Sequence, residues 1–189
     1  GKQGLKVAVN VAPLQLTQPN FVETVAAALH QTGLAAEHLE LELTESVLLH
    51  NFAGVQQTLC ALEQLGVALT IDDFGTGYSS LSYLRDLPIS SIKIDRSFVR
   101  DLSAPRRAPQ YALALIEAIL SIAQALDLEV VAEGIETQAQ LDVVRDLGCH
   151  VGQGFHWSKP LAPAVLERCL PLAPEAGQAA AGEGYRSLN

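Results

Sequence analysis

The hydrophobic positions along the chain form short apolar runs that alternate with longer segments of helical periodicity. The apolar runs predict six strands, at residues 5–11, 39–45, 67–73, 91–95, 128–134 and 150–155. Apolar residues at three- and four-residue steps predict helices at residues 19–32, 52–65, 79–86, 110–126, 137–147 and 163–170. Strands and helices that alternate in this way are typical of βα units on a parallel sheet, so we expect an α/β fold.

Polar residues lie at the carboxyl end of each predicted strand, where an apolar core would not require them. They are Asn10, Glu42, Asp72 with Asp73, Lys93 with Asp95, Glu133, and Gln153. In a parallel α/β array these strand ends lie at one face, where the active sites of open sheets and barrels are found. Side-chain alternation places Glu40 and Glu42 on one face of their strand and the neighbouring leucines on the other. The pattern therefore predicts a cluster of carboxylates with one carboxamide and one ammonium.

Such a cluster of acids is unstable unless its members protonate, pair with cations or coordinate a metal. A single lysine, Lys93, cannot balance it. Hard divalent cations such as Mg²⁺ or Mn²⁺ prefer carboxylate and amide oxygens. Two such ions close together would suit the hydrolysis of a phosphate ester.

Each of these residues taken alone has a simpler interpretation. Asp72 and Asp73 could cap the turn that follows them, and Lys93 could be a surface charge. Glu133 with Glu136 could begin a helix. The metal-site hypothesis depends on the coincidence of position across six strands, and at this point both interpretations stay open.

Composition limits the partners. The 189 residues are 49% hydrophobic, enough for one buried core, and 12 basic against 21 acidic residues give a net charge of −9. This charge disfavours binding of a DNA or RNA duplex by neutralisation of its phosphates. Cys60, Cys149 and Cys169 show no CxxC spacing, which favours a reducing compartment. The longest apolar segment, residues 111–126, is too short to span a bilayer, so we expect a cytoplasmic chain.

Six motifs, in order along the chain, resemble those of one family. They are NVAPLQL, LELELTES, TIDDFGTGYSSLSYL, SIKIDRSFV, VVAEGIET and GQGFHWSKP. Over residues 5 to about 170 the chain resembles the EAL-domain family of cyclic di-GMP phosphodiesterases. The resemblance implies a TIM-like (β/α)8 barrel of EAL type, here at residues 1–170, followed by a flexible Ala/Gly-rich tail at 171–189.

The resemblance also implies that this barrel is incomplete. The Glu-Ala-Leu motif that names the family is absent from the sequence, and six of the eight barrel strands are present, with the first two missing. We therefore expect a piece of a longer protein, in which a metal-ligating glutamate precedes Gly1. The 189-residue chain by itself is expected to be weakly active or inactive.

By resemblance, two Mg²⁺ or Mn²⁺ ions support the hydrolysis of cyclic di-GMP to linear pGpG. The implied metal ligands are Asn10, Glu42, Asp72, Asp73 and Glu133. Glu133 is also the implied general base, and Lys93 the group that holds the attacking water or the phosphate. The residues implied at the substrate or in support of the site are Asp95, Gln153, Glu45 and Glu136, of which Glu45 braces the DFGTGYSS loop.

Two other functions stay open from the sequence. One is a receptor that binds cyclic di-GMP without cleaving it, and the other is a scaffold for protein interaction. Retention of the acids at the strand ends favours the enzyme. The resemblance further implies a homodimer linked to an upstream regulatory domain, with any membrane anchor in a segment outside this chain.

Overall fold

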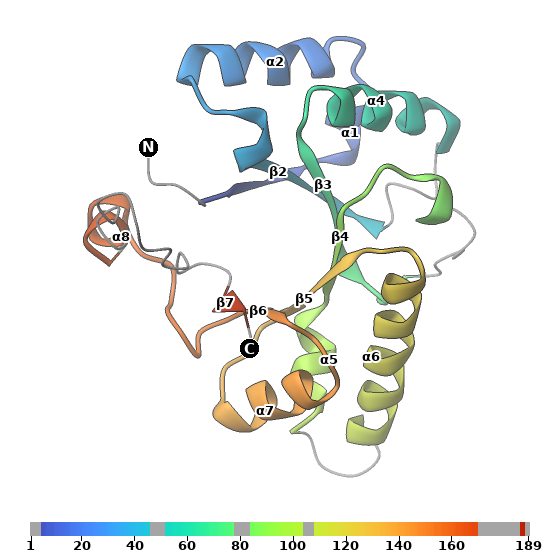
Figure 1. Ribbon diagram of the computed structural model, residues 1–189, viewed down its shortest axis with the longest axis vertical. Helices are drawn as coiled ribbons and strands as arrows, with labels where there is room; N and C mark the ends of the chain where they lie inside the picture. Colours follow the sequence, from blue (N-terminus) through green and yellow to red (C-terminus); the bar gives the residue numbers. More distant parts are fainter. Residues whose placement is uncertain (1–4, 46–51, 78–83, 104–107, 170–185, 188–189) are drawn as a thin grey trace. The chain divides into compact units, whose positions relative to one another are not determined.

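The computed structural model describes residues 5–45, 52–77, 84–103, 108–169 and 186–187. The chain divides into two compact units. The N-terminal unit is Lys6–Lys93 with Ser121–Glu129, and the C-terminal unit is Ile94–Leu120 with Val130–Asn189, together with Gly1–Leu5. Figure 1 colours both along the sequence.

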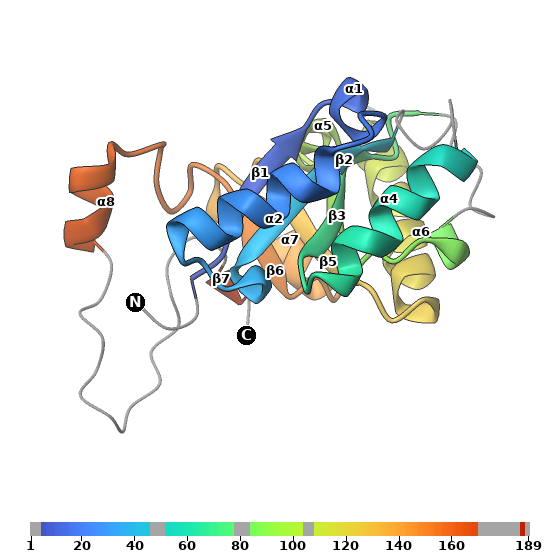
Figure 2. The same ribbon diagram turned by 90° about the horizontal axis from the view of Figure 1, so that it is seen from above.

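A parallel sheet forms the centre of the N-terminal unit. Its strands, in spatial order, are β1 (Val7–Val11), β2 (Leu39–Thr44), β3 (Ala68–Phe74) and β4 (Ser91–Ile94). The other elements are α1 (Pro13–Leu16), α2 (Phe21–Thr32), the 3₁₀ turns η1 (Ala36–His38) and η2 (Leu84–Asp86), and α4 (Phe52–Gln64). Helices α2 and α4 lie beside one another on one side of β1, β2 and β3 (Figure 1 and Figure 2).

Strand β2 has buried polar side chains on one face and buried apolar side chains on the other. Leu41 and Leu43 are 3% and 0% exposed, and Glu40 and Glu42 on the opposite face are each only 5% exposed. Both faces of the strand are therefore buried. Val55, Leu59 and Leu62 of α4 supply further buried apolar side chains, at the three- and four-residue steps of an amphipathic helix.

The C-terminal unit contains the remaining elements. They are α5 (Arg96–Asp101), most of α6 (Ala108–Ala125), β5 (Glu129–Glu133), α7 (Gln138–Asp146), β6 (Val151–Gln153), α8 (Pro163–Cys169) and β7 (Arg186–Ser187). Strands β5 and β6 pair in parallel, and β7 pairs antiparallel with β6. Thr137 caps α7: its hydroxyl accepts from the Gln140 N–H at 3.3 Å, while Gln140 Oε1 accepts from the Thr137 N–H at 3.0 Å.

All six predicted strands form, with ends that differ by no more than two residues from the predicted ends. Five of the predicted helices correspond to α2, α4, α6, α7 and α8. The prediction for 79–86 falls largely outside the described residues, and its last residues form η2. The short elements α1, α5 and β7 were not predicted. Most of the predicted tail, 171–189, lies outside the described residues. No described helix has both the length and the apolar character needed to cross a membrane.

Candidate functional site

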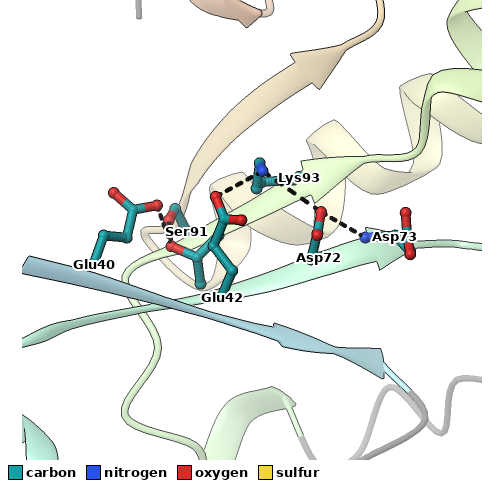
Figure 3. A network of polar contacts seen from close by, with 7 residues as sticks. Glu40, Glu42, Asp72, Asp73, Ser91 and Lys93 are labelled. Atoms are coloured by element: carbon teal, nitrogen blue, oxygen red, sulfur yellow. Dashed lines mark hydrogen bonds and ion pairs between the residues drawn. The ribbon is translucent and has the colours of Figure 1, made fainter. Parts of the chain in front are cut away.

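A buried ion-pair network joins three adjacent strands of the N-terminal unit (Figure 3). Lys93 Nζ on β4 donates to Glu42 Oε1 on β2 at 2.7 Å and lies 3.6 Å from Asp72 Oδ1 on β3. The side chains of Lys93, Glu42 and Asp72 are 4%, 6% and 14% exposed. The interpretation of Lys93 as a surface charge is therefore wrong, because its ammonium lies between two carboxylates inside the unit.

Asp72 and Asp73 present their carboxylates close together although they are consecutive in the chain. In a regular strand, neighbouring side chains point to opposite faces. Asp73 departs from the strand conformation, with φ of 55°, a left-handed value that aspartate tolerates better than most residues. Its backbone N–H donates to Asp72 Oδ1 at 3.0 Å, and carboxylate oxygens of the two residues lie within 4.8 Å of one another. This geometry allows both carboxylates to share a cation.

Asn10 extends the row of polar groups to β1. The register of the two strands makes Asn10 the direct neighbour of Glu42, so that its amide lies at the same level of the sheet as the acid. Asn10 is exposed in this chain, whereas Glu42 is buried. The structure thus places Asn10, Glu42, Asp72, Asp73 and Lys93 in one region of the N-terminal unit.

Glu45 contacts the loop that follows β3. It is 5% exposed, and its Oε2 accepts from the Gly75 N–H at 3.0 Å. A Cβ added at Gly77 would lie only 2.6 Å from Glu45 Oε1, so a side chain there would require the Glu45 carboxylate to shift. Oε1 itself has no hydrogen-bond partner among the described residues. The later part of the predicted DFGTGYSS loop lies outside those residues.

In the C-terminal unit, two of the predicted site residues end neighbouring strands. Glu133 ends β5 and Gln153 ends β6, and the two are direct partners in the parallel register. A pocket of about 200 Å³ opens at this edge. Its lining residues are Arg96, Glu133, Gly134, Glu136, Gln153, Gly154 and Phe155. Glu136, predicted to support the site, therefore lies at the same pocket as Glu133.

Gly134 allows Arg96 to reach this pocket. Its φ is 71°, and a Cβ at Gly134 would lie 2.5 Å from the Cβ of Arg96. Only glycine combines this backbone conformation with so close an approach. Arg96 and Phe155 were not predicted as site residues, although Arg96 directly follows Asp95 and Phe155 follows Gln153 by two positions.

Asp95, predicted to lie at the substrate or in support of the site, has a structural role at the start of α5. Its Oδ1 accepts from the Ser97 N–H at 3.0 Å and from the Ser97 hydroxyl, which makes Asp95 the N-cap of α5. A carboxylate at an N-cap satisfies a backbone donor that has no partner within the helix. The prediction that Asp95 lies at the substrate or supports the site stays a prediction.

The donor set fits a hard divalent cation. In the described part of the N-terminal unit, the side chains gathered with Asp72 are oxygen donors and one ammonium, without a thiolate or an imidazole. Carboxylate and amide oxygens suit Mg²⁺ or Mn²⁺, whereas zinc and copper sites use sulfur and nitrogen.

The similarity to known proteins bears on this chemistry. A family model, described as EAL domain, matches residues 1–160. The chain belongs to the EAL-domain family. It is 48% identical over 170 residues to the cyclic di-GMP phosphodiesterase NbdA of Pseudomonas aeruginosa, which covers 90% of the chain and 21% of NbdA. The chain thus spans about a fifth of the length of this relative.

Solved EAL structures share the fold. The PaMucR phosphodiesterase in complex with c-di-GMP matches with a TM-score of 0.80 and 40% identity, over 85% of this chain and 64% of that one. BlrP1 of Klebsiella pneumoniae, in a manganese and cyclic di-GMP complex, matches with a TM-score of 0.75 and 32% identity, over 82% and 39%. Among the described residues, strands β1 to β6 therefore belong to part of a TIM-like barrel of EAL type, which confirms the predicted family and fold class.

Proposed function

We propose that the full-length protein that carries this chain is a metal-dependent phosphodiesterase that hydrolyses cyclic di-GMP to linear pGpG. The observation that carries the proposal is the buried network of Lys93 with Glu42 and Asp72, with Asp73 beside it. A structural role alone would not require several acids to be held together at strand ends. The similarity to NbdA and to PaMucR supports cyclic di-GMP as the substrate.

The proposed ligands of two Mg²⁺ or Mn²⁺ ions are Asn10, Glu42, Asp72, Asp73 and Glu133. Bound there, the ions would offset the negative charge of the phosphodiester and make a water molecule more acidic. The manganese complex of BlrP1 supports a divalent ion in this family, and the oxygen donors of the N-terminal unit support a hard one.

The remaining residues have proposed roles in one hydrolysis step. Glu133 accepts the proton of the attacking water, whose oxygen forms a new bond to one phosphorus. The bond from that phosphorus to the ribose 3′ oxygen breaks, and this oxygen takes up a proton, which leaves a linear dinucleotide with a 5′ phosphate. Lys93 holds the water or a phosphate oxygen by its positive charge.

Four further residues are proposed to support that step. Gln153 and Asp95 contact the substrate side of the site. Glu45 holds the loop after β3 through the Gly75 N–H, a bond of 3.0 Å. Glu136 lines the pocket beside Glu133 and supports the position of that acid.

The direct test uses the full-length protein with cyclic di-GMP. With Mn²⁺ or Mg²⁺ we expect pGpG to accumulate, measured by chromatography, and a chelator in excess to stop the reaction. If folded protein releases no pGpG with either metal, the proposed activity is wrong. Calorimetric binding of cyclic di-GMP without turnover would indicate a receptor instead.

Assembly stays a prediction. A homodimer and an upstream regulatory domain are implied by the family resemblance. Sedimentation of the full-length protein would test the first, and its complete sequence would test the second.

A further inference from the structure

A second polar network lies beside the one that contains Lys93. Thr70 Oγ1 on β3 donates to Glu40 Oε1 on β2 at 2.6 Å, and it lies 2.5 Å from Ser91 Oγ on β4. Glu40, Thr70 and Ser91 are 5%, 0% and 4% exposed. Figure 3 shows Glu40 and Ser91 on the same strands as Glu42 and Lys93. None of these three residues has a role in the proposed reaction.

The hydrogen bonds of this network have a defined direction. A threonine hydroxyl carries one hydrogen, and Thr70 donates it to the Glu40 carboxylate. The contact between Thr70 and Ser91 therefore has Ser91 as the donor and Thr70 as the acceptor. These two hydrogen bonds lead from Ser91 through Thr70 to Glu40, and they link three adjacent strands through side chains alone.

Each member lies two residues before a member of the ion-pair network. Glu40 precedes Glu42, Thr70 precedes Asp72, and Ser91 precedes Lys93. Residues two apart on a strand point to the same face, about 6.6 Å apart along it. The three strands are thus joined at two successive levels, with hydroxyl groups at one and the lysine ammonium at the next.

The level of Glu40, Thr70 and Ser91 consists of polar side chains, although apolar residues could fill the same interior positions. Parallel barrels usually fill such interior positions with branched apolar residues. A buried polar set replaced by well-packed apolar residues often gives equal or greater stability. Directional hydrogen bonds have a different consequence from apolar contacts, because they restrict how one strand can shift relative to the next.

We propose that Glu40, Thr70 and Ser91 are positioning residues that hold Glu42, Asp72 and Lys93 at the spacing required for metal binding and turnover. This inference rests on the proposed phosphodiesterase function. The three residues act through the strands that they join, and none of them contacts the substrate.

The test compares Thr70→Val with Thr70→Ser in the full-length protein. Valine has nearly the shape of threonine but no hydroxyl, so it breaks both hydrogen bonds, whereas serine keeps them. We expect Thr70→Val to weaken Mn²⁺ binding about 10- to 100-fold by calorimetry, the range seen when a group behind a metal ligand is removed. In Thr70→Val we also expect kcat to fall while KM for cyclic di-GMP changes little. In Thr70→Ser we expect the Mn²⁺ affinity and kcat to stay within about threefold of the original protein.

Two further variants separate positioning from stability. Ser91→Ala removes the Ser91 hydroxyl that donates to Thr70 and leaves the hydrogen bond from Thr70 to Glu40. It therefore tests the inference even if Thr70→Val does not fold. We expect Ser91→Ala to weaken Mn²⁺ binding, but less than Thr70→Val does. Val25→Ala in α2 removes a buried side chain, 7% exposed, far along the chain from the network. It provides a loss of stability without a change at these hydrogen bonds.

The outcomes separate the inference from the function beneath it. If Thr70→Val and Ser91→Ala lose stability as Val25→Ala does but keep the original Mn²⁺ affinity and kcat, the network is only structural and the inference is wrong. If the original protein neither binds Mn²⁺ nor releases pGpG, the proposed function fails and the inference fails with it.

Discussion

Replacement of Lys93 by methionine tests the buried ion-pair network most directly. Methionine keeps an unbranched side chain of similar length but removes the ammonium. Glu42 and Asp72 would then lose the cation that is 2.7 Å and 3.6 Å from their oxygens. Because both carboxylates are largely shielded from water, solvent cannot fully replace that cation.

The size of the effect follows from these distances. At an effective dielectric constant of about 20, unit charges at 2.7 Å and 3.6 Å attract by about 6 and about 5 kcal/mol. Loss of hydration by all three groups offsets much of this attraction. Removal of one partner from a buried pair typically costs about 3–5 kcal/mol, so we expect Lys93→Met to lower the free energy of unfolding by about that amount.

The assay is urea unfolding followed by circular dichroism, in buffer that contains a chelator. Arg145→Met is the matched control, because Arg145 Nη2 lies 2.8 Å from Asp142 Oδ1 while these side chains are 48% and 45% exposed. Exposed pairs contribute about 1 kcal/mol or less, so the control should change stability little. If Lys93→Met destabilises the protein no more than Arg145→Met does, the ammonium does not have the buried role that we assign to it.

Three other changes have defined outcomes. Glu133→Gln should abolish release of pGpG and leave calorimetric binding of cyclic di-GMP largely intact, whereas Glu129→Gln, at the exposed start of the same strand, should keep activity. Gly77→Ala should lower the free energy of unfolding by about 1 kcal/mol in urea, because its Cβ would lie 2.6 Å from Glu45 Oε1 and displace that carboxylate from the Gly75 N–H. Thr137→Ala should lower the melting temperature through a loss of about 1 kcal/mol, since α7 loses its N-cap; an unchanged melting temperature would contradict this.

The regular elements could be predicted from sequence because each has a local period. In β2, leucines at alternate positions with glutamates between them predict a strand and assign Glu40 and Glu42 to one face, as the structure has it. The elements that escaped prediction are short. Helix α5 has six residues and β7 has two, too few for a hydrophobic period to show.

The candidate site could be predicted only in outline. The position of Glu42, Asp72 and Lys93 at strand ends predicted that they lie in one site. It did not predict the ion pairs that Lys93 forms with the two acids. Lys93 and Glu42 are 51 residues apart in the chain, and Thr70 and Glu40 are 30 apart. Their contacts depend on the register of neighbouring strands, which no local pattern encodes. The left-handed conformation of Asp73 was likewise invisible, since aspartate adopts it only where the surrounding structure requires it.

Three acids at and just after β2 show how the fold separates support from chemistry. Glu40, Glu42 and Glu45 are each 5% exposed, yet their partners differ: a hydroxyl at 2.6 Å, an ammonium at 2.7 Å and a backbone N–H at 3.0 Å. Hydroxyl and backbone donors are directional and bind the acid in one orientation. The Lys93 ammonium attracts Glu42 mainly by charge, as a divalent cation bound nearby would. Of these three acids, Glu42 is the one that we propose as a metal ligand, while we expect Glu40 and Glu45 to hold the strand and the loop around it.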